Sequence, residues 1–250
     1  MTEIFSPAAQ QFLDSVLALN AKLAVFDCDG TLWTGDSGAD FFYWELERKL
    51  IPAGVAEWAV PRYEDYKAGN VDEETMCGEM VTINAGLLER ELEDCAEEFF
   101  AGVVEQRIFP EMLGLTHRLA AAGCELWAVS STNVWAVRAG VKRFGIRPEN
   151  VLAAEVHIKN GLATDRLVRV PSGPAKATAI REVVRRPVSA CFGNSIHDLA
   201  MLEMAEKAFA VNPNPDLDSI AQEKRWTIYW PTGTSALVAD ERSLQGREKP

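Results

Sequence analysis

Two carboxylates, Asp27 and Asp29, directly follow the apolar residues 23–26 and precede a Gly-Thr turn. A short apolar run of this kind is typical of a strand buried on both faces, as in a parallel sheet. Side chains two positions apart leave an extended backbone on the same side, so both carboxylates can face one small reacting group. Two like charges held so close disfavour joint ionisation, and we therefore expect a metal ion beside them. A simple turn with an Asx cap is the alternative interpretation.

Ser130 occupies the corresponding place after a second apolar run, residues 125–129. Ligands of parallel sheets collect beyond the carboxyl ends of the strands, so we expect Ser130 to lie near Asp27. Its hydroxyl and the neighbouring backbone N–H groups could hold a phosphoryl oxygen. Ser131 and Asn133 follow in the same segment and are predicted to contact the substrate. An ordinary turn serine is the alternative.

The composition restricts the classes of protein to which the chain can belong. A chain of 250 residues with 48% hydrophobic content fits one large domain or one domain with an insertion. The net charge of −12 makes nucleic acid and anionic membranes unlikely partners. No apolar run reaches membrane-spanning length and no signal-peptide pattern is seen, so we expect a cytoplasmic protein. Five cysteines without a C-x-x-C pair argue against a disulfide framework or a zinc site.

Apolar strands and amphipathic helices alternate along much of the sequence, which predicts a parallel sheet covered on both faces. The region from about residue 35 to 106 is different, because it predicts only helices. Asn160-Gly161 after an alternating segment predicts a β-hairpin. Strands are expected over 23–26, 125–129, 150–154, 187–192, 207–211 and 226–230. A first helix is expected from residue 7, and further helices over 38–50, 54–67, 72–85, 88–101, 110–122, 134–144, 174–185, 197–204 and 215–224.

The run Asp27-x-Asp29-Gly-Thr-Leu resembles the first motif of the haloacid dehalogenase-like (HAD) phosphohydrolases. The resemblance implies that Asp27 is the nucleophile that attacks phosphorus and that Asp29 is the general acid and base. The chemistry suits these residue types, since an aspartyl-phosphate divides one slow displacement into two faster ones. Asp29 would protonate the leaving alkoxide and then take a proton from the attacking water.

Three further residues match later motifs of the same family. Lys176, at the start of a helix, resembles the lysine that pairs with the nucleophile and the phosphate; Lys159 and Lys142 are alternatives. Residues 193–198 resemble the acidic motif that binds Mg²⁺, although Asn194 stands where many relatives have an aspartate. The resemblance implies a Mg²⁺ site formed by Asp27, Asp29, Asn194 and Asp198. An amide oxygen brings no charge, so weaker metal binding is expected.

The resemblance also implies the fold class and its division into domains. We expect an α/β protein with a doubly wound parallel sheet, a HAD/Rossmann-like core, and an inserted helical cap of the phosphoserine-phosphatase-like branch. The predicted core comprises residues 1–34 and 107–250, and the predicted cap comprises residues 35–106.

Residues of the cap region bear on the substrate. Asp36 falls where phosphoserine phosphatases place the carboxylate that receives the substrate ammonium, whereas Met80 falls near their arginine for the serine carboxylate. A neutral or cationic alcohol phosphate is therefore favoured over phosphoserine. Asp36 and Trp33 would suit an aromatic box for a quaternary ammonium. The alternative is that the aromatic residues in this region fill the cap's own core.

The sequence thus predicts a Mg²⁺-dependent phosphatase that hydrolyses a small phosphomonoester through an aspartyl-phosphate. Two alternatives remain. One is a phosphoserine phosphatase proper, and the other is a binding or regulatory module that kept the fold but lost turnover, which Asn194 motivates.

Overall fold

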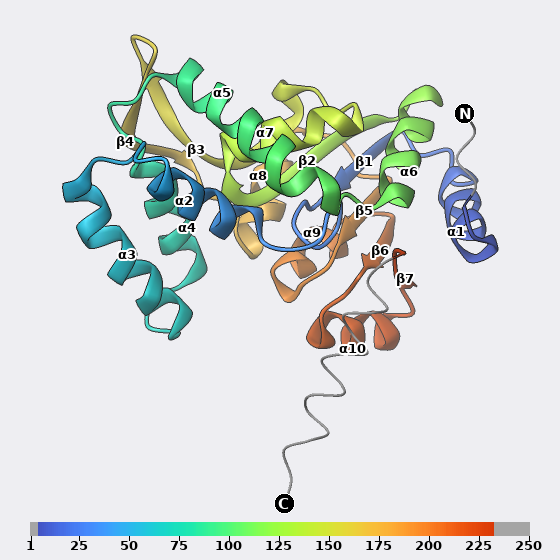
Figure 1. The fold of residues 1–250 in the computed structure, drawn as a ribbon. Coiled ribbons are helices and arrows are strands. Elements are labelled where there is room, and N and C mark those ends of the chain that lie inside the picture. Colours follow the sequence, from blue (N-terminus) through green and yellow to red (C-terminus); the bar gives the residue numbers. More distant parts are fainter. Residues whose placement is uncertain (1–4, 233–250) are drawn as a thin grey trace, which may run out of the picture.

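A seven-stranded sheet forms the centre of the protein in a computed structural model that describes residues 5–232 (Figure 1). The strand order is β4-β3-β2-β1-β5-β6-β7, and all neighbouring pairs are parallel except β3 with β4. The strands are β1 (Leu23–Phe26), β2 (Glu125–Asn133), β3 (Val151–Lys159), β4 (Leu162–Arg169), β5 (Ala190–Gly193), β6 (Lys207–Val211) and β7 (Thr227–Tyr229). The predicted α/β fold with a mainly parallel sheet is confirmed.

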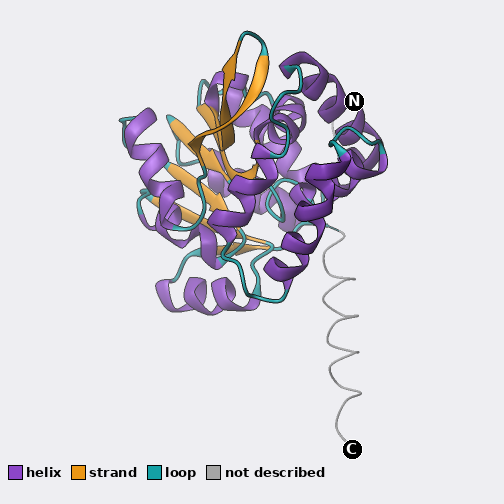
Figure 2. Ribbon diagram, turned by 90° about the vertical axis from the view of Figure 1, so that its left-hand side faces the viewer, coloured by secondary structure: helices purple, strands orange, loops and turns teal. Residues whose placement is uncertain are grey.

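Helices lie on both sides of this sheet (Figure 2). One face packs against α1 (Pro7–Leu17), α5 (Glu89–Phe99), α6 (Pro110–Ala121) and α7 (Val134–Val141). The other face packs against α8 (Pro174–Val183), α9 (Leu199–Glu203) and α10 (Pro215–Lys224). The alternation of β1 explains both layers, because Ala24 and Phe26 belong to the first apolar cluster and Leu23 and Val25 to the second.

Local signals in the sequence determine several element boundaries. Ser6 caps α1 by accepting a hydrogen bond from the backbone N–H of Ala9, and Pro7 begins the helix, as predicted. The predicted hairpin joins β3 to β4 through Asn160 and Gly161, whose φ angles of 54° and 76° suit a tight two-residue turn. The strand predicted over 125–129 is longer, since β2 stays extended through Asn133.

The region after β1 is helical, as expected, and holds α2 (Ser37–Glu47), α3 (Ala53–Lys67), α4 (Glu73–Thr82) and α5. The first three helices share an apolar cluster of their own, which includes Phe42, Tyr63 and Met76. The α5 helix belongs instead to the core cluster, and it continues into a π-helical turn over Phe100–Val104. We use "cap helices" below for α2, α3 and α4, which lie together at one end of the molecule (Figure 1).

Two further expectations concern membranes and thiols. Within residues 5–232, no helix has the length and apolar character needed to cross a membrane. All five cysteines are free thiols.

Candidate active site

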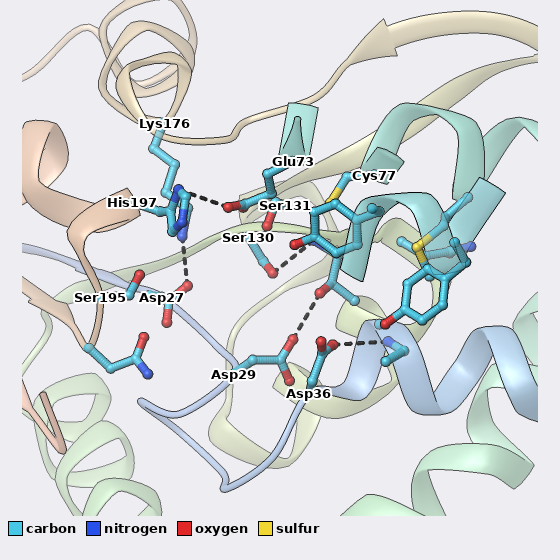
Figure 3. Close-up of a pocket in the computed structure, with 18 residues that line it drawn as sticks. Asp27, Asp29, Asp36, Glu73, Cys77, Ser130, Ser131, Lys176, Ser195 and His197 are labelled. Carbon is cyan, nitrogen blue, oxygen red and sulfur yellow. Dashed lines mark hydrogen bonds and ion pairs between the residues drawn. The ribbon is translucent and has the colours of Figure 1, made fainter. Parts of the chain in front are cut away.

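A buried lysine joins two carboxylates at the carboxyl edge of the sheet. Asp27 follows β1, Lys176 lies in the first turn of α8, and Asp198 follows β5. The Lys176 Nζ atom lies 2.7 Å from Asp27 Oδ1 (Figure 3). The same atom lies 2.5 Å from Asp198 Oδ1. All three residues are at least nine-tenths buried. The sequence places these residues far apart, and the parallel sheet brings them together.

The charges in this group strongly affect one another. Burial and the nearby Asp198 raise the pKa of Asp27 to about 7, while the Lys176 ammonium acts in the opposite direction. Although burial opposes its charged form, the two carboxylates raise the pKa of Lys176, which therefore stays protonated. Two carboxylates and one ammonium leave an excess negative charge in a buried place, which is costly unless a further cation offsets it.

The loop around Asp27 is closely packed. The Thr31 hydroxyl donates to Asp27 Oδ2 at 2.8 Å, and the Asp27 backbone N–H donates to the carbonyl of Phe192 in β5. Gly30 has a φ of +78°, and a Cβ atom there would lie 1.9 Å from the side-chain nitrogen of Asn194. Glycine is therefore required at position 30, and it brings the Asn194 amide close to the backbone beside Asp29.

Asp198, predicted as a ligand of Mg²⁺, contacts Lys176 and two backbone N–H groups. Its Oδ1 atom contacts Lys176, and its Oδ2 atom accepts hydrogen bonds from the backbone N–H groups of Asn194 and Ser195 at 2.9 and 3.0 Å. Both oxygens thus have protein partners, and Oδ1 holds the Lys176 ammonium. In the described part of the chain, no group of three or more His, Cys, Asp or Glu residues could hold a metal ion.

Three donors surround the carboxylate of Asp29. The Trp33 indole Nε1 and the Ser37 backbone N–H donate to Oδ1 at 2.7 and 2.8 Å. The Thr132 hydroxyl donates to Oδ2 at 2.8 Å. Its side chain is therefore held in one orientation by three protein donors.

Ser130, Ser131 and Asn133 all line the same pocket as Asp27. Ser130 is buried in β2, and its Oγ atom accepts a hydrogen bond from the backbone N–H of Thr132. Ser131 lines the pocket together with Cys77 of α4. Asn133 caps α7 by accepting from the Trp135 backbone N–H at 3.0 Å, so its side chain also has a structural use.

The pocket, with a cavity volume of about 230 Å³, lies between the carboxyl edge of the sheet and the cap helices. Tyr63 and Tyr66 of α3 line its cap side, together with Glu73 and Met80 of α4. Glu73 Oε2 lies 2.7 Å from His197 Nδ1, and this contact joins the cap to the loop after β5 (Figure 3). No arginine lines the pocket among the residues that the structure describes.

The two residues predicted for cation binding have different places. Asp36 lines the pocket and caps α2 by accepting a hydrogen bond from the Ala39 backbone N–H at 2.9 Å. Burial and the nearby Asp29 raise the pKa of Asp36 to about 6. Trp33 is fully buried outside the pocket and packs against Phe100 and Phe144. The prediction that Trp33 forms part of an aromatic box is therefore wrong.

Some pocket residues were missed by the sequence interpretation. Thr132 had a local signal, since it is two positions after Ser130 in an extended segment and so points to the same side. Glu73 had none, because only the packing of α4 beside β2, β3 and β4 brings it to the pocket.

Comparison with known proteins identifies the family. The sequence model of the haloacid dehalogenase-like hydrolases matches residues 24–203, which include β1, the cap helices and the segment carrying Lys176 and Asp198. The chain belongs to this family. The HAD fold and the phosphoserine-phosphatase-like branch predicted from the motifs are confirmed, and the chain is a phosphomonoester hydrolase by family.

Individual relatives support this assignment. The chain is 27% identical over 220 residues to a histidinol-phosphatase from Neisseria meningitidis, covering 83% of this chain and 97% of the relative. It is 28% identical over 144 residues to a phosphoserine phosphatase from Mycobacterium tuberculosis, covering 55% of this chain and 46% of the relative. A protein of unknown function from Bordetella pertussis has the same fold, with a TM-score of 0.72 and 24% identity, covering 83% of this chain and 97% of that one.

Proposed function

We propose that this HAD hydrolase is a Mg²⁺-dependent phosphatase that hydrolyses a small phosphomonoester through an aspartyl-phosphate on Asp27. The observation that carries the proposal is the contact of Asp27 with Lys176, which Asp198 holds in turn. A fixed ammonium beside a carboxylate can draw a phosphoryl group toward that carboxylate and stabilise the charge that develops during transfer.

The reaction has two steps in which atoms and protons balance. A carboxylate oxygen of Asp27 forms a bond to phosphorus while the bond from phosphorus to the alcohol oxygen breaks, and Asp29 gives its proton to that oxygen. Water then attacks the phosphorus while the bond from phosphorus to the Asp27 oxygen breaks, and Asp29 takes a proton from the water. Phosphate leaves and the Asp27 carboxylate is restored. Ser130 and Lys176 would hold the phosphoryl oxygens in both steps.

The residues present fit a magnesium ion. Mg²⁺ prefers oxygen ligands, and the Asp27 carboxylate and the Asn194 side-chain amide provide them on neighbouring loops at the edge of the sheet. The excess negative charge around Lys176 would also repel a phosphate unless a cation offsets it. When bound, Mg²⁺ would neutralise charge on the phosphoryl oxygens. Asn194 brings no charge, so we expect binding weaker than that of a site with a second carboxylate.

The cap side of the pocket favours an alcohol that carries a positive charge. Asp36 and Glu73 are carboxylates in that part of the pocket, and Tyr63 and Tyr66, which also line it, are of a residue type that attracts cations. By its name, the relative from N. meningitidis acts on histidinol phosphate, whose amino group is a cation. We therefore propose cationic amino-alcohol phosphates, such as histidinol phosphate, as the substrate class.

Phosphoserine is the second candidate, supported by the relative from M. tuberculosis. Its carboxylate would face Asp36, Glu73 and the apolar Met80, with no arginine among the described pocket residues to receive it. Like charges in a partly buried pocket repel strongly. We accordingly expect phosphoserine to be the poorer substrate.

Phosphate release by the purified full chain tests the proposal. Histidinol phosphate, phosphocholine, phosphoserine and glycerol phosphate would each be supplied with and without Mg²⁺. We expect Mg²⁺-dependent release that is fastest for the cationic esters, and an acid-quenched phosphopeptide that contains Asp27. Asp27→Asn should abolish release, whereas Asp165→Asn, at an exposed position on β4, should not. A wild-type protein that binds these esters without releasing phosphate would instead indicate the regulatory module.

A further inference from the structure

Trp33 lies outside the pocket but contacts a group inside it. Its side chain is fully buried, with its ring 5.1 Å from that of Phe100 in an edge-on arrangement and 5.9 Å from that of Phe144. A Cβ atom at Gly140 would lie 2.8 Å from the Trp33 ring, so α7 also restricts the indole. The indole N–H donates to Asp29 Oδ1 at 2.7 Å. A rigid aromatic group thus fixes one oxygen of a carboxylate that lines the pocket.

The chemistry of the three donors distinguishes the two oxygens of Asp29. Oδ1 accepts from the Trp33 indole and from the Ser37 backbone amide, and both of these groups can only donate. An O–H group on Oδ1 would therefore face two N–H groups. Oδ2 contacts the Thr132 hydroxyl, which can rotate and either donate or accept. Only Oδ2 can carry a proton without opposing its neighbours.

We infer that Trp33 is a positioning residue that orients the Asp29 carboxylate, so that Oδ2 is the oxygen that gives and takes the proton in catalysis. The inference rests on the proposed function, in which Asp29 is the acid and base. Thr132 lines the pocket beside Asp29, so Oδ2 lies on the side where the substrate binds. Trp33 itself never touches the substrate.

The proton transfers balance in this arrangement. In the first step the proton leaves Asp29 Oδ2 for the alcohol oxygen as its bond to phosphorus breaks, and the Thr132 hydroxyl turns from acceptor to donor. In the second step a proton from the attacking water returns to Oδ2, and the hydroxyl turns back. The bonds from Trp33 and Ser37 to Oδ1 persist throughout, so the carboxylate need not rotate.

Trp33→Phe is the test, because it keeps an aromatic ring and removes the N–H. Trp135→Phe is the matched control: Trp135 is also buried, and its indole N–H has no hydrogen-bond partner among the described residues. The readout is kcat/KM, which reports formation of the phosphoenzyme, for an alkyl phosphate and for p-nitrophenyl phosphate. An alkoxide needs the proton as it leaves, whereas p-nitrophenolate does not.

We expect Trp33→Phe to lower kcat/KM for the alkyl ester by about 10- to 100-fold, the value of one hydrogen bond to a charged group, and for the aryl ester by less than about threefold. Trp135→Phe should change both only slightly. Equal losses on the two esters, or the same selective loss in Trp135→Phe, would overturn the inference while the proposed function stands. An inactive wild-type protein would overturn both.

A second pair of variants keeps the test valid if Trp33→Phe folds poorly. Thr132→Val removes the hydroxyl beside Oδ2, and Thr132→Ser keeps it. We expect Thr132→Val to show the same selective loss on the alkyl ester and Thr132→Ser to restore most of it. Equal behaviour of the two variants on both esters would show that the hydroxyl takes no part, and would also contradict the inference. Melting temperatures of all variants separate these outcomes from loss of fold.

Discussion

The two ends of the pocket differ in how their charges are held. At the sheet end, Lys176 contacts both Asp27 and Asp198, and each carboxylate accepts at least one further hydrogen bond. At the cap end, Glu73 has one ionic partner among the described residues, His197, which is about half exposed.

This difference separates two tasks. A closely connected group of buried charges has one favourable arrangement, which suits a reaction that is the same for every phosphate ester. Singly held groups can exchange their partners for those of a ligand at little cost, which suits recognition of the variable alcohol. We therefore expect substitutions at the sheet end to affect turnover and folding together, and substitutions at the cap end to affect mainly the choice of substrate.

The largest effect is expected for Lys176→Met. Removing the ammonium leaves Asp27 and Asp198 as close buried carboxylates without a counter-ion, which costs about 3–5 kcal/mol of folding stability. We also expect phosphate release to fall by about 10³-fold or more, because the charge of the transferring group loses its partner. Denaturant unfolding and steady-state kinetics measure the two losses. Lys159→Met, at the exposed end of β3, is the control and should match the wild type. A variant that keeps its stability would show that the sheet end is less tightly connected than the contacts indicate.

Asn194→Asp should strengthen Mg²⁺ binding by about tenfold, because a second carboxylate beside Asp27 adds charge to the oxygen ligands. The same charge repels Asp27 when the metal is absent. The melting temperature without Mg²⁺ should therefore fall, and the rise on adding Mg²⁺ should exceed that of the wild type. Asn160→Asp, in the exposed turn between β3 and β4, adds the same charge away from the pocket. It should change neither the melting temperature without Mg²⁺ nor the rise in melting temperature on adding Mg²⁺. Unchanged Mg²⁺ affinity in Asn194→Asp would place the metal elsewhere.

The comparison also explains how much could be predicted from the sequence. The sheet end was predictable because its residues directly follow apolar strands, whose carboxyl ends a parallel sheet must bring together. Asp27 and Ser130 carry that signal, whereas Lys176 lies at the start of a helix, α8, and was predicted from the family resemblance. For Asp198, a second signal was overlooked: Ser195 and Asp198 have the spacing of a capping box, which turns the carboxylate toward backbone N–H groups and leaves its other oxygen for Lys176.

The cap end was less predictable, because helical periodicity predicts that a helix exists but not which neighbour it packs against. The helices α2, α3 and α4 lie within two or three residues of their expected bounds, yet nothing local places Glu73 in the pocket. Trp33 is the reverse case, because it was predicted to lie in the pocket and lies outside it. It follows the catalytic motif closely, but the turn at Gly30, whose N–H donates to the Trp33 carbonyl, returns the chain to the core.

Glu73→Gln should alter substrate choice at the cap end. We expect KM for a cationic phosphate ester to rise by about three- to tenfold, while KM for glycerol phosphate and both kcat values change little. Loss of the bridge to the half-exposed His197 should cost at most about 1 kcal/mol of stability. Glu74→Gln, at the next and exposed position of α4, is the control. Equal changes in KM for both esters would remove Glu73 from cation recognition, and a fall in kcat would tie the cap end to turnover.

The smallest effect is expected at Glu45 of α2, a buried carboxylate outside the pocket that has no ionic partner among the described residues. Burial raises the pKa of Glu45 well above its usual value, and a hydrogen bond with Asn84 opposes this only in part. The folded state thus favours the neutral acid. The stability that the neutral form of Glu45 gives is complete at pH values below the pKa of Glu45 in the unfolded chain. It is lost as the pH rises through the pKa of Glu45 in the folded protein.

Glu45→Gln imitates the neutral acid at every pH. At about pH 8 we expect the variant to melt a few degrees above the wild type, and at about pH 5 we expect this difference to shrink. Glu47→Gln, exposed at the end of the same helix, should shift neither melting temperature. If Glu45→Gln raised the melting temperature equally at both pH values, the cause would be the packing of the new side chain and not the charge of Glu45. A loss at high pH would mean that Glu45 stays charged in the folded state, so that a carboxylate outside the sheet end is stabilised without the counter-ion that Asp27 and Asp198 require.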